Sequence, residues 1–183
     1  MKFATRARVA LLLLVVASLA GAALPAIAQA SPAQPEALLH PSDLTKILPG
    51  AVFFRGQSAT VQERNSGGVR FADGYYVLAT MVDNSGYSSG VQDKYQAYFI
   101  TEVPLEIGGH HLPPGAYGVG ILKSASTPTF VAMDIGEHDL FQAAAVDDAK
   151  LHRPTPLQVL AGSEAGKYRL YLGRNYIEFQ RAQ

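Results

Sequence analysis

The sequence predicts an all-β protein, an antiparallel β-sandwich of about ten short strands with a short helix near its N-terminus. Apolar and polar residues alternate in short stretches, and Gly, Pro, Asn or Asp separate these stretches every eight to twelve residues or so. The interior shows no helical period and no repeat of fixed length. Strands and loops of unequal length favour a two-sheet sandwich, and a closed β-barrel with an internal pocket is the alternative.

The first thirty residues have the order of a secretory signal peptide. Basic residues precede the apolar run Leu11–Val16, and small-x-small sites predict cleavage after Ala28 or Ala30. The alternative is an uncleaved membrane anchor, which Gly21 and Pro25 disfavour because they interrupt the apolar segment. We therefore expect a periplasmic or secreted protein of bacterial type.

The chain divides into a signal peptide (1–30), a Pro/Ala tether (31–41) and a single β-domain (42–183). After cleavage at Ala30, 12 Lys and Arg remain against 15 Asp and Glu, without a basic cluster, so a nucleic-acid partner is not expected. The chain has no Cys, which excludes thiol catalysis, Cys-based zinc sites and a lipid anchor. No later segment is apolar enough to span a membrane, and no cofactor is expected.

In the first half of the domain, Ser42 is the candidate N-cap of a short helix that ends at Pro49-Gly50. Asn65–Gly68 and Asp73-Gly74 have the composition of turns. Residues 75–82 are apolar on both faces, as in a central strand. The strands expected here are 51–55, 57–64, 69–71 and 75–82.

In the second half, 83–90 is a polar loop and 93–101 a strand with Tyr95 and Phe99 on the same side. Residues 101–122 predict strand, turn and strand, with His110-His111 in the connection. The C-terminal residues alternate around a turn at Gly173–Asn175 and predict a hairpin. The further strands expected are 129–135, 140–146 and 157–161.

Within residues 101–122, an alternating strand and a Gly-containing turn precede the segment Leu112-Pro113-Pro114-Gly115-Ala116-Tyr117. This pattern resembles an element of small secreted bacterial β-domains that are grouped as families of unknown function. The resemblance covers about twenty residues, and here a second Pro replaces the Ala usual in the pattern. It implies an exported antiparallel β-domain and brings no catalytic residue with it.

Aromatic side chains are the candidate ligand-binding residues. Tyr75, Tyr87, Tyr95 and Phe99 could line a pocket for a small apolar molecule or a glycan, since Tyr combines contact area with a polar tip. The absence of Trp disfavours a glycan. Packing within the sheet is the alternative for most of them, whereas Tyr87 stands alone in a polar loop.

Two groups of titratable residues are candidates for chemistry. His110, His111 and His138 are candidate metal ligands, but adjacent strand residues point to opposite faces, and the alternative is a solvated turn. Asp134 to Asp139 contains the carboxylates that a hydrolase would need, although no G-x-S-x-G motif occurs. Neither group makes an enzyme the preferred hypothesis. Glu106 or Asp139 could complete a metal site.

Three functions remain open. The preferred one is a non-catalytic exported domain of the cell envelope that acts through protein contacts, including self-association at a sheet edge, or as a structural accessory. An exposed apolar edge strand would favour it. A closed cavity lined by the aromatic residues would favour a small-ligand carrier. His138 beside a distant acid in a cleft would favour a hydrolase.

Overall fold

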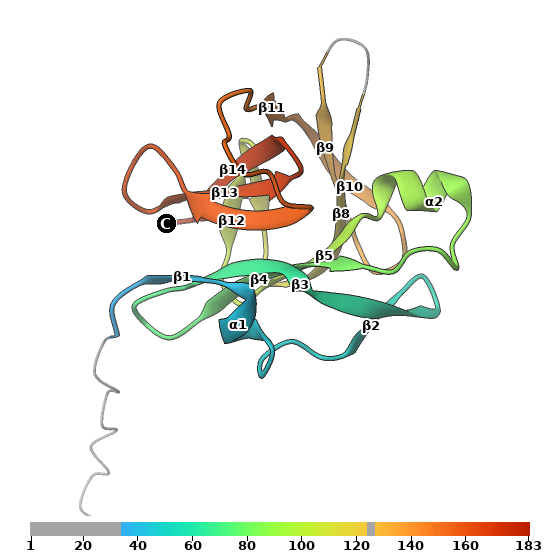
Figure 1. The fold of residues 1–183 in the computed structure, drawn as a ribbon, viewed down its shortest axis with the longest axis horizontal. Helices are drawn as coiled ribbons and strands as arrows, with labels where there is room; N and C mark the ends of the chain where they lie inside the picture. Colours follow the sequence, from blue (N-terminus) through green and yellow to red (C-terminus); the bar gives the residue numbers. More distant parts are fainter. Residues whose placement is uncertain (1–33, 124–126) are drawn as a thin grey trace, which may run out of the picture. The chain divides into compact units, whose positions relative to one another are not determined.

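Two antiparallel sheets pack face to face in the computed structural model, which describes residues 34–123 and 127–183 (Figure 1). The larger, 8-stranded sheet has the order β1-β3-β4-β5-β8-β9-β10, with β2 paired to β3. The smaller, 6-stranded sheet has the order β12-β13-β14-β6-β7, with β11 paired to β14. The antiparallel sandwich predicted from the sequence is confirmed, and the closed barrel is wrong. The predicted signal peptide and the first three residues of the tether lie outside the described residues.

The strands of the larger sheet are β1 (Ala37–Leu39), β2 (Ala51–Phe54), β3 (Gln57–Arg70), β4 (Tyr76–Val82), β5 (Ala97–Thr101), β8 (Gly115–Leu122), β9 (Thr129–Met133) and β10 (Asp139–Ala144). The strands of the smaller sheet are β6 (Leu105–Ile107), β7 (His110–Leu112), β11 (Val146–Asp147), β12 (Leu157–Ala161), β13 (Lys167–Leu172) and β14 (Asn175–Arg181). The two helices are α1 (Pro41–Leu44) and α2 (Ser89–Lys94).

The central strands of the larger sheet are buried on both faces. Its inner face packs against the smaller sheet through fully buried side chains such as Phe99 and Leu170. Its outer face carries a second apolar cluster, where Leu44 of α1, Phe54 of β2 and Val131 of β9 come together. This double burial explains why the β4 sequence is apolar at nearly every position.

The stretch 101–122, predicted as one hairpin, is shared between the two sheets. β6 and β7 form a hairpin of their own, with Ile107 opposite His110, and Gly108 and Gly109 both have positive φ, as a tight two-residue turn requires. The predicted pairing of 103–107 with 116–122 is therefore wrong, because β8 pairs instead with β5 and β9. His110-His111 lies in a strand, not in a connection.

The turn predicted at Asn65–Gly68 is also wrong, because these residues lie inside β3, which runs for 14 residues. The strand is irregular between Gln62 and Ser66 and then continues along β4. A Cβ atom on Gly67 would lie 2.8 Å from the backbone nitrogen of Val159 in β12. Glycine is needed here for the close approach of two backbones, not for a turn.

The helices also differ from the prediction. α1 begins at Pro41 after His40, whose N–H donates to the Asp43 carboxylate at 2.9 Å, so Ser42 is not the N-cap. Part of the predicted tether forms β1 and pairs with β3. α2 was not predicted, and it replaces the start of the strand expected over 93–101. Only Val91 of this helix is buried, so its sequence lacks an apolar face of helical period.

The C-terminal hairpin is confirmed. β13 and β14 pair with Leu170 opposite Ile177 and Tyr168 opposite Phe179. All four side chains are buried between the sheets. Local alternation and a turn with positive φ at Gly173 were sufficient to define this unit.

Candidate functional site

The last strand of the larger sheet, β10, has a free edge. In the part of the chain that the structure describes, β9 is its only strand partner. The Ala145 N–H donates to the Pro128 carbonyl at 2.8 Å, and the alternation of an antiparallel ladder then directs the backbone groups of Phe141 and Ala143 toward β9. The N–H and C=O groups of Gln142 and Ala144, and the C=O group of Leu140, consequently point away from β9, and the ladder is irregular just before Leu140. We call residues 140–144 the β10 edge.

The two faces of β10 differ. Phe141 and Ala143 are half-buried and pack against the core between the sheets. Leu140, Gln142 and Ala144 are exposed on the other face, and Leu140 has 46% of its surface accessible. The strand therefore presents an apolar side chain beside outward-facing backbone donors and acceptors.

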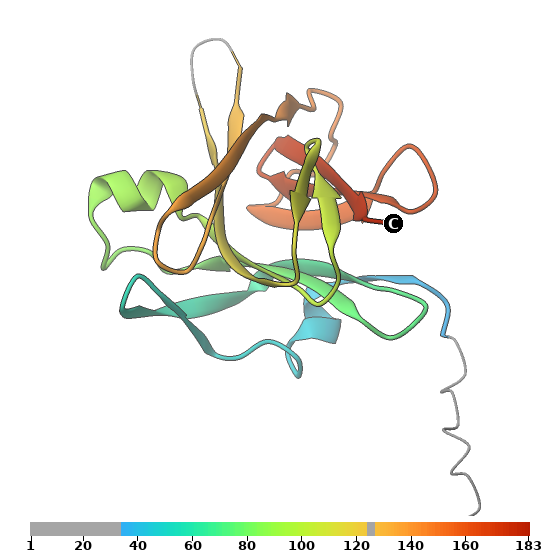
Figure 2. The same ribbon diagram turned by 180° about the vertical axis from the view of Figure 1, so that it is seen from behind.

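The β6–β7 hairpin closes the inner side of β10 (Figure 2). The His110 ring stacks on the Phe141 ring, with 4.6 Å between centroids and 11° between planes. A Cβ atom on Gly108 would lie 2.7 Å from the Cβ of Ala143, so the hairpin turn packs closely against the strand. These contacts hold β10 in place without occupying its outward-facing backbone.

The predicted metal ligands do not converge. His110 is stacked on Phe141, His111 Nδ1 lies 3.2 Å from Glu106 Oε1, and His138 lies in the β9–β10 turn. Within residues 34–123 and 127–183, no group of three or more His, Asp or Glu side chains is placed to hold a metal ion.

The carboxylates of the β9–β10 turn each have a local partner. Asp134 accepts hydrogen bonds from the backbone N–H groups of Gly136 and His138, and the bond from His138 is the main cause of its lowered pKa. Glu137 pairs with Arg55 at 2.5 Å, and Asp139 pairs with Lys94 at 2.9 Å. His138 Nδ1 lies 2.9 Å from Asp134, and both side chains are exposed. This arrangement ties the turn to β2 and α2 and does not bring His138 together with a distant acid.

The four aromatic candidates lie in different places. Tyr87 and Tyr95 are buried in the outer cluster of the larger sheet, whereas Phe99 is buried on the opposite face against Phe179. Tyr75 is 50% exposed next to β4. The prediction that Tyr95 and Phe99 share one face is wrong, because Tyr95 follows helix α2 and is not part of β5. The four side chains do not line a common cavity.

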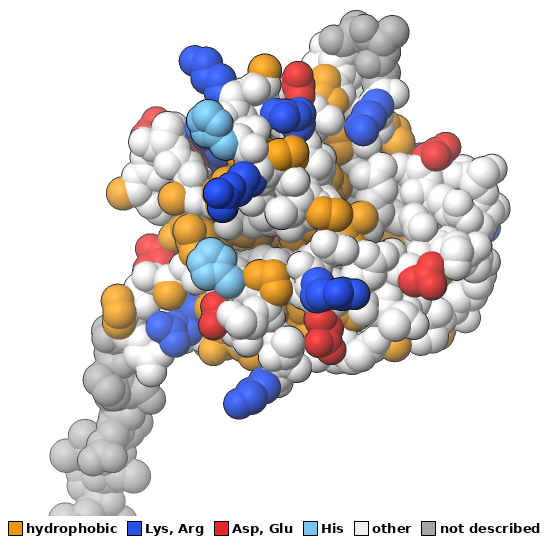
Figure 3. Space-filling view, viewed as in Figure 1, with side chains coloured by type: hydrophobic (Ala, Val, Ile, Leu, Met, Phe, Trp, Pro, Cys, Tyr) orange, Lys and Arg blue, Asp and Glu red, His pale blue; other side chains and the backbone are white. Residues whose placement is uncertain are grey.

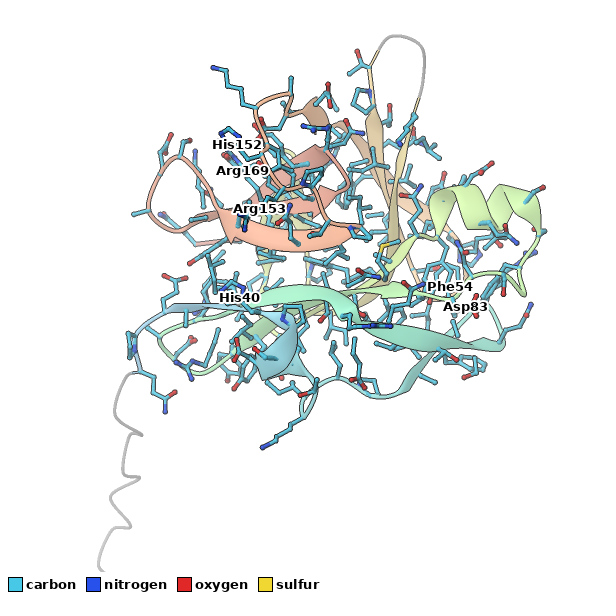
Figure 4. The ribbon with its side chains drawn as sticks, viewed as in Figure 1. His40, Phe54, Asp83, His152, Arg153 and Arg169 are labelled. Atoms are coloured by element: carbon cyan, nitrogen blue, oxygen red, sulfur yellow. The ribbon has the colours of Figure 1, made fainter. Side chains whose placement is uncertain are left out.

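Tyr87 and Tyr95 instead pack around Phe54, which Figure 4 shows on β2 below α2. The Phe54 ring is stacked on Tyr95 at 3.9 Å and meets Tyr87 edge-on at 6.2 Å. The Tyr87 hydroxyl donates to the Phe54 carbonyl at 3.0 Å. Tyr87, the isolated aromatic of the polar loop, thus fastens that loop to β2. The Tyr95 hydroxyl is buried and has no hydrogen-bond partner among the described residues, and this burial raises its pKa.

We expect Tyr95→Phe to raise the free energy of unfolding by about 1 kcal/mol, because it removes a buried hydroxyl that makes no hydrogen bond. Tyr87→Phe is the matched control, and it should lower the same free energy by about 1 kcal/mol because a hydrogen bond is lost. Urea unfolding followed by circular dichroism measures both values. If both substitutions lower the free energy of unfolding by the same amount, the Tyr95 hydroxyl must make a hydrogen bond, contrary to the structure.

A small groove lies between β12 and the segment formed by α1 and the irregular part of β3. It has a volume of about 260 Å³, with Leu39 and Pro41 on one side and Pro156 and Leu157 on the other. Figure 3 shows hydrophobic side chains along this hollow. In Figure 4, His40 lies on the α1 side and Arg153 on the β12 side. Arg64 also lines the groove, so its rim carries a cation near an apolar floor.

The β10 edge was not among the residues selected from the sequence. A signal for it was present, since Leu140–Val146 is a run of seven residues without charge, Pro or Gly. The sequence alone does not show which of the predicted strands lies at the end of a sheet, so this run could equally have belonged to a central strand.

Comparisons of the chain with models of protein families, with curated proteins and with solved structures find no match. The resemblance of residues 103–122 to secreted bacterial β-domains therefore stays a prediction. None of the helices in the described ranges is long and apolar enough to cross a membrane.

Proposed function

We propose that this chain is an exported, non-catalytic β-domain that acts through protein contacts, and that the β10 edge is its contact surface. The observation that carries the proposal is an uncharged edge strand with outward backbone groups and an exposed Leu140. Unpaired strand edges take up further strands, because each added strand satisfies the free backbone donors and acceptors.

Three other ends of the sheets are less suited to this role. β1 has three residues, and β7 carries two exposed histidines within three residues. β12 lies against β3, where Gly67 approaches the backbone of Val159. Short length, polar side chains and covering by another strand are the ordinary ways in which proteins protect a sheet edge. Over residues 140–144, β10 is five residues long, carries Gln142 as its one polar side chain, and has no strand on its outer side among the described residues.

The β10 edge has defined limits. At its start, the pairing with β9 is irregular between Asp139 and Phe141, and Asp139 is paired with Lys94. At its end, the chain crosses into the smaller sheet, where Val146 lies opposite Tyr176. Because both ends are bounded, the β10 edge can pair with a partner strand of only about five residues, each of which advances roughly 3.4 Å.

The groove beside β12 favours a small apolar ligand as the second candidate function. Its floor is apolar and Arg64 offers a cation to an acidic group on the ligand. Its volume of about 260 Å³ is at the lower end of small-molecule sites, which usually have roughly 300–1,000 Å³. A hydrolase is the least supported function, because the acids of the β9–β10 turn are engaged in separate local pairs.

Site-specific photo-crosslinking in the producing cell tests the proposal. The full chain, with its own N-terminus, carries benzoylphenylalanine in place of Gln142, and a matched variant carries it in place of Gln57, which is exposed at the start of β3. We expect a discrete cross-linked protein product from position 142 and none from position 57. The product should be outside the cytoplasm, with the chain shortened at Ala28 or Ala30.

Ala144→Pro supplies the second arm of the experiment. The N–H of Ala144 points away from β9, so Pro removes a donor that the sheet does not use, as is tolerated on edge strands. The product at position 142 should disappear while the melting temperature stays close to that of the parent chain. A product that persists in the Ala144→Pro background, or no product from position 142, would overturn the β10 edge as the contact surface.

A further inference from the structure

We infer that the strand taken up by the β10 edge is β10 of a second copy of this chain, which joins the two larger sheets across a two-fold axis. This inference rests on the proposed function and names its partner. It follows from the register, the side chains and the charge of residues 139–146.

The backbone of the β10 edge matches itself. Gln142 and Ala144 direct their N–H and C=O groups outward, and Leu140, which follows the register shift, directs its C=O group outward. With two antiparallel copies centred on Gln142, Gln142 faces the partner's Gln142, and Leu140 faces the partner's Ala144. The two Gln142 residues can exchange two hydrogen bonds, and each Ala144 N–H can donate to the Leu140 carbonyl of the partner subunit. The outward N–H groups of Gln142 and Ala144 and the outward C=O groups of Gln142 and Leu140 then have a partner in one register.

The side chains of this register fit as well. On the exposed face, the large Leu140 lies beside the small Ala144 of the partner subunit, and on the inner face Phe141 lies beside the partner's Ala143. A large residue thus always meets a small one, which avoids both a gap and a clash between cross-strand neighbours. The exposed Leu140, accessible over 46% of its surface, gains a contact on the partner strand.

Charge favours a second copy over an unrelated strand. Residues 140–146 carry no charge, so pairing brings no like charges together within the β10 edge. Asp139 of each copy falls near the partner's Ala145, and the two Asp139 residues lie at opposite ends of the paired strands. Selection of a different protein normally uses complementary charges. An uncharged edge with a self-matching register selects a copy of itself.

The contact is small. A five-residue strand pair buries much less than the roughly 1,600 Å² of a standard stable interface. We therefore expect an association that depends on protein concentration. Sedimentation velocity of the mature chain should show a monomer at low concentration and a dimer as the concentration rises, and Gln142→Pro should abolish the dimer.

The absence of Cys in the natural sequence allows a direct test of the register. Residues that face each other in a hydrogen-bonded antiparallel pair have Cα atoms about 5.5 Å apart, within the roughly 4.4–6.8 Å range of disulfides. Gln142→Cys should therefore oxidise to a disulfide-linked dimer. Leu140→Cys is the matched control, because its two copies would be offset by four residues, roughly 13 Å along the strands.

We expect the Gln142→Cys dimer to form on the order of tenfold faster than dimers of Leu140→Cys or Gln57→Cys, owing to the high effective concentration of paired thiols. Equal rates for the three variants, or a chain that remains monomeric at every concentration, would overturn the second copy as partner. The photo-crosslinked product separates this outcome from failure of the proposed function. A product of twice the chain mass supports self-pairing, and a product with a different protein overturns self-pairing while the contact surface stands.

Discussion

Replacing Phe54 with Ala is expected to lower the free energy of unfolding by about 3–5 kcal/mol, the usual cost of removing a large buried aromatic side chain. Phe54 is fully buried, and its ring stacks on Tyr95 and meets Tyr87 edge-on. A Cβ atom on Gly118 would overlap with this ring, which shows how closely Phe54 lies on β8. The substitution therefore opens a cavity between β2, α2 and the larger sheet.

Phe53→Ala is the matched control for Phe54→Ala. Phe53 precedes Phe54 in β2, but its side chain points to the other face and is 58% exposed. Removing it should change the free energy of unfolding by about 0.5 kcal/mol at most. Chemical denaturation of both variants measures the difference. If the two substitutions lower the free energy of unfolding equally, the Phe54 side chain is not packed between the β2–β3 hairpin and the larger sheet.

Gly120→Ala is expected to lower the free energy of unfolding by about 3 kcal/mol. A Cβ atom at this position of β8 would overlap with the carbonyl oxygen of Lys94 at the end of α2. The obstacle is backbone, so it cannot move aside as a flexible side chain could. The helix would have to separate from the sheet, and the neighbouring pair between Lys94 and Asp139 would be disturbed.

Gly90→Ala, a substitution within α2 itself, is expected to have the opposite effect on stability. No atom lies within 4 Å of a Cβ at Gly90, so Ala fits without a clash. Ala is also the better helix former, and we expect the free energy of unfolding to rise by up to about 1 kcal/mol. Thermal and urea unfolding of the Gly120→Ala and Gly90→Ala variants would show whether α2 packs on β8. Similar stability of the two variants would mean that this helix lies elsewhere.

The packing of Phe54 and Gly120 also affects the β10 edge. Lys94 at the end of α2 binds Asp139 at the start of β10, and Arg55 at the β2–β3 turn binds Glu137 in the turn before it. The Arg55 N–H also donates to the Ile135 carbonyl at 2.7 Å. The outer apolar cluster therefore positions the elements that hold the β9–β10 turn. Loss of Phe54 or Gly120 should loosen that turn as well as lower stability.

Local patterns predicted those parts of the fold whose partners are close in sequence or whose faces are uniform. The β13–β14 hairpin needs only alternating residues and a short turn, and both are contained in about fifteen residues. The β4 strand has apolar residues on both faces, and this alone predicts a central position. Many such stretches together predict the class of the fold, because each can be interpreted from its own residues alone.

The same patterns were ambiguous where one residue type serves two purposes. Asn65–Gly68 has the composition of a turn, but Gly67 and Gly68 lie in β3 because other backbones approach them closely. Both uses require the absence of a side chain, so the sequence cannot separate them. Tyr95 and Phe99 have the spacing of one strand face, yet Tyr95 ends a helix and packs on the opposite face of the sheet.

The sequence by itself determined that this chain is an all-β protein of short antiparallel strands, since alternation and turn composition are local properties, and it left the sandwich and the closed barrel as alternatives. Only the tertiary structure decided which strands pair and which strand is left at the end of a sheet. β5 pairs with β8 across the inserted β6–β7 hairpin, and β10 has no strand on its outer side among the described residues. Strand order depends on the packing of segments far apart in the chain, so the free edge at Gln142 emerges only after the two sheets have assembled.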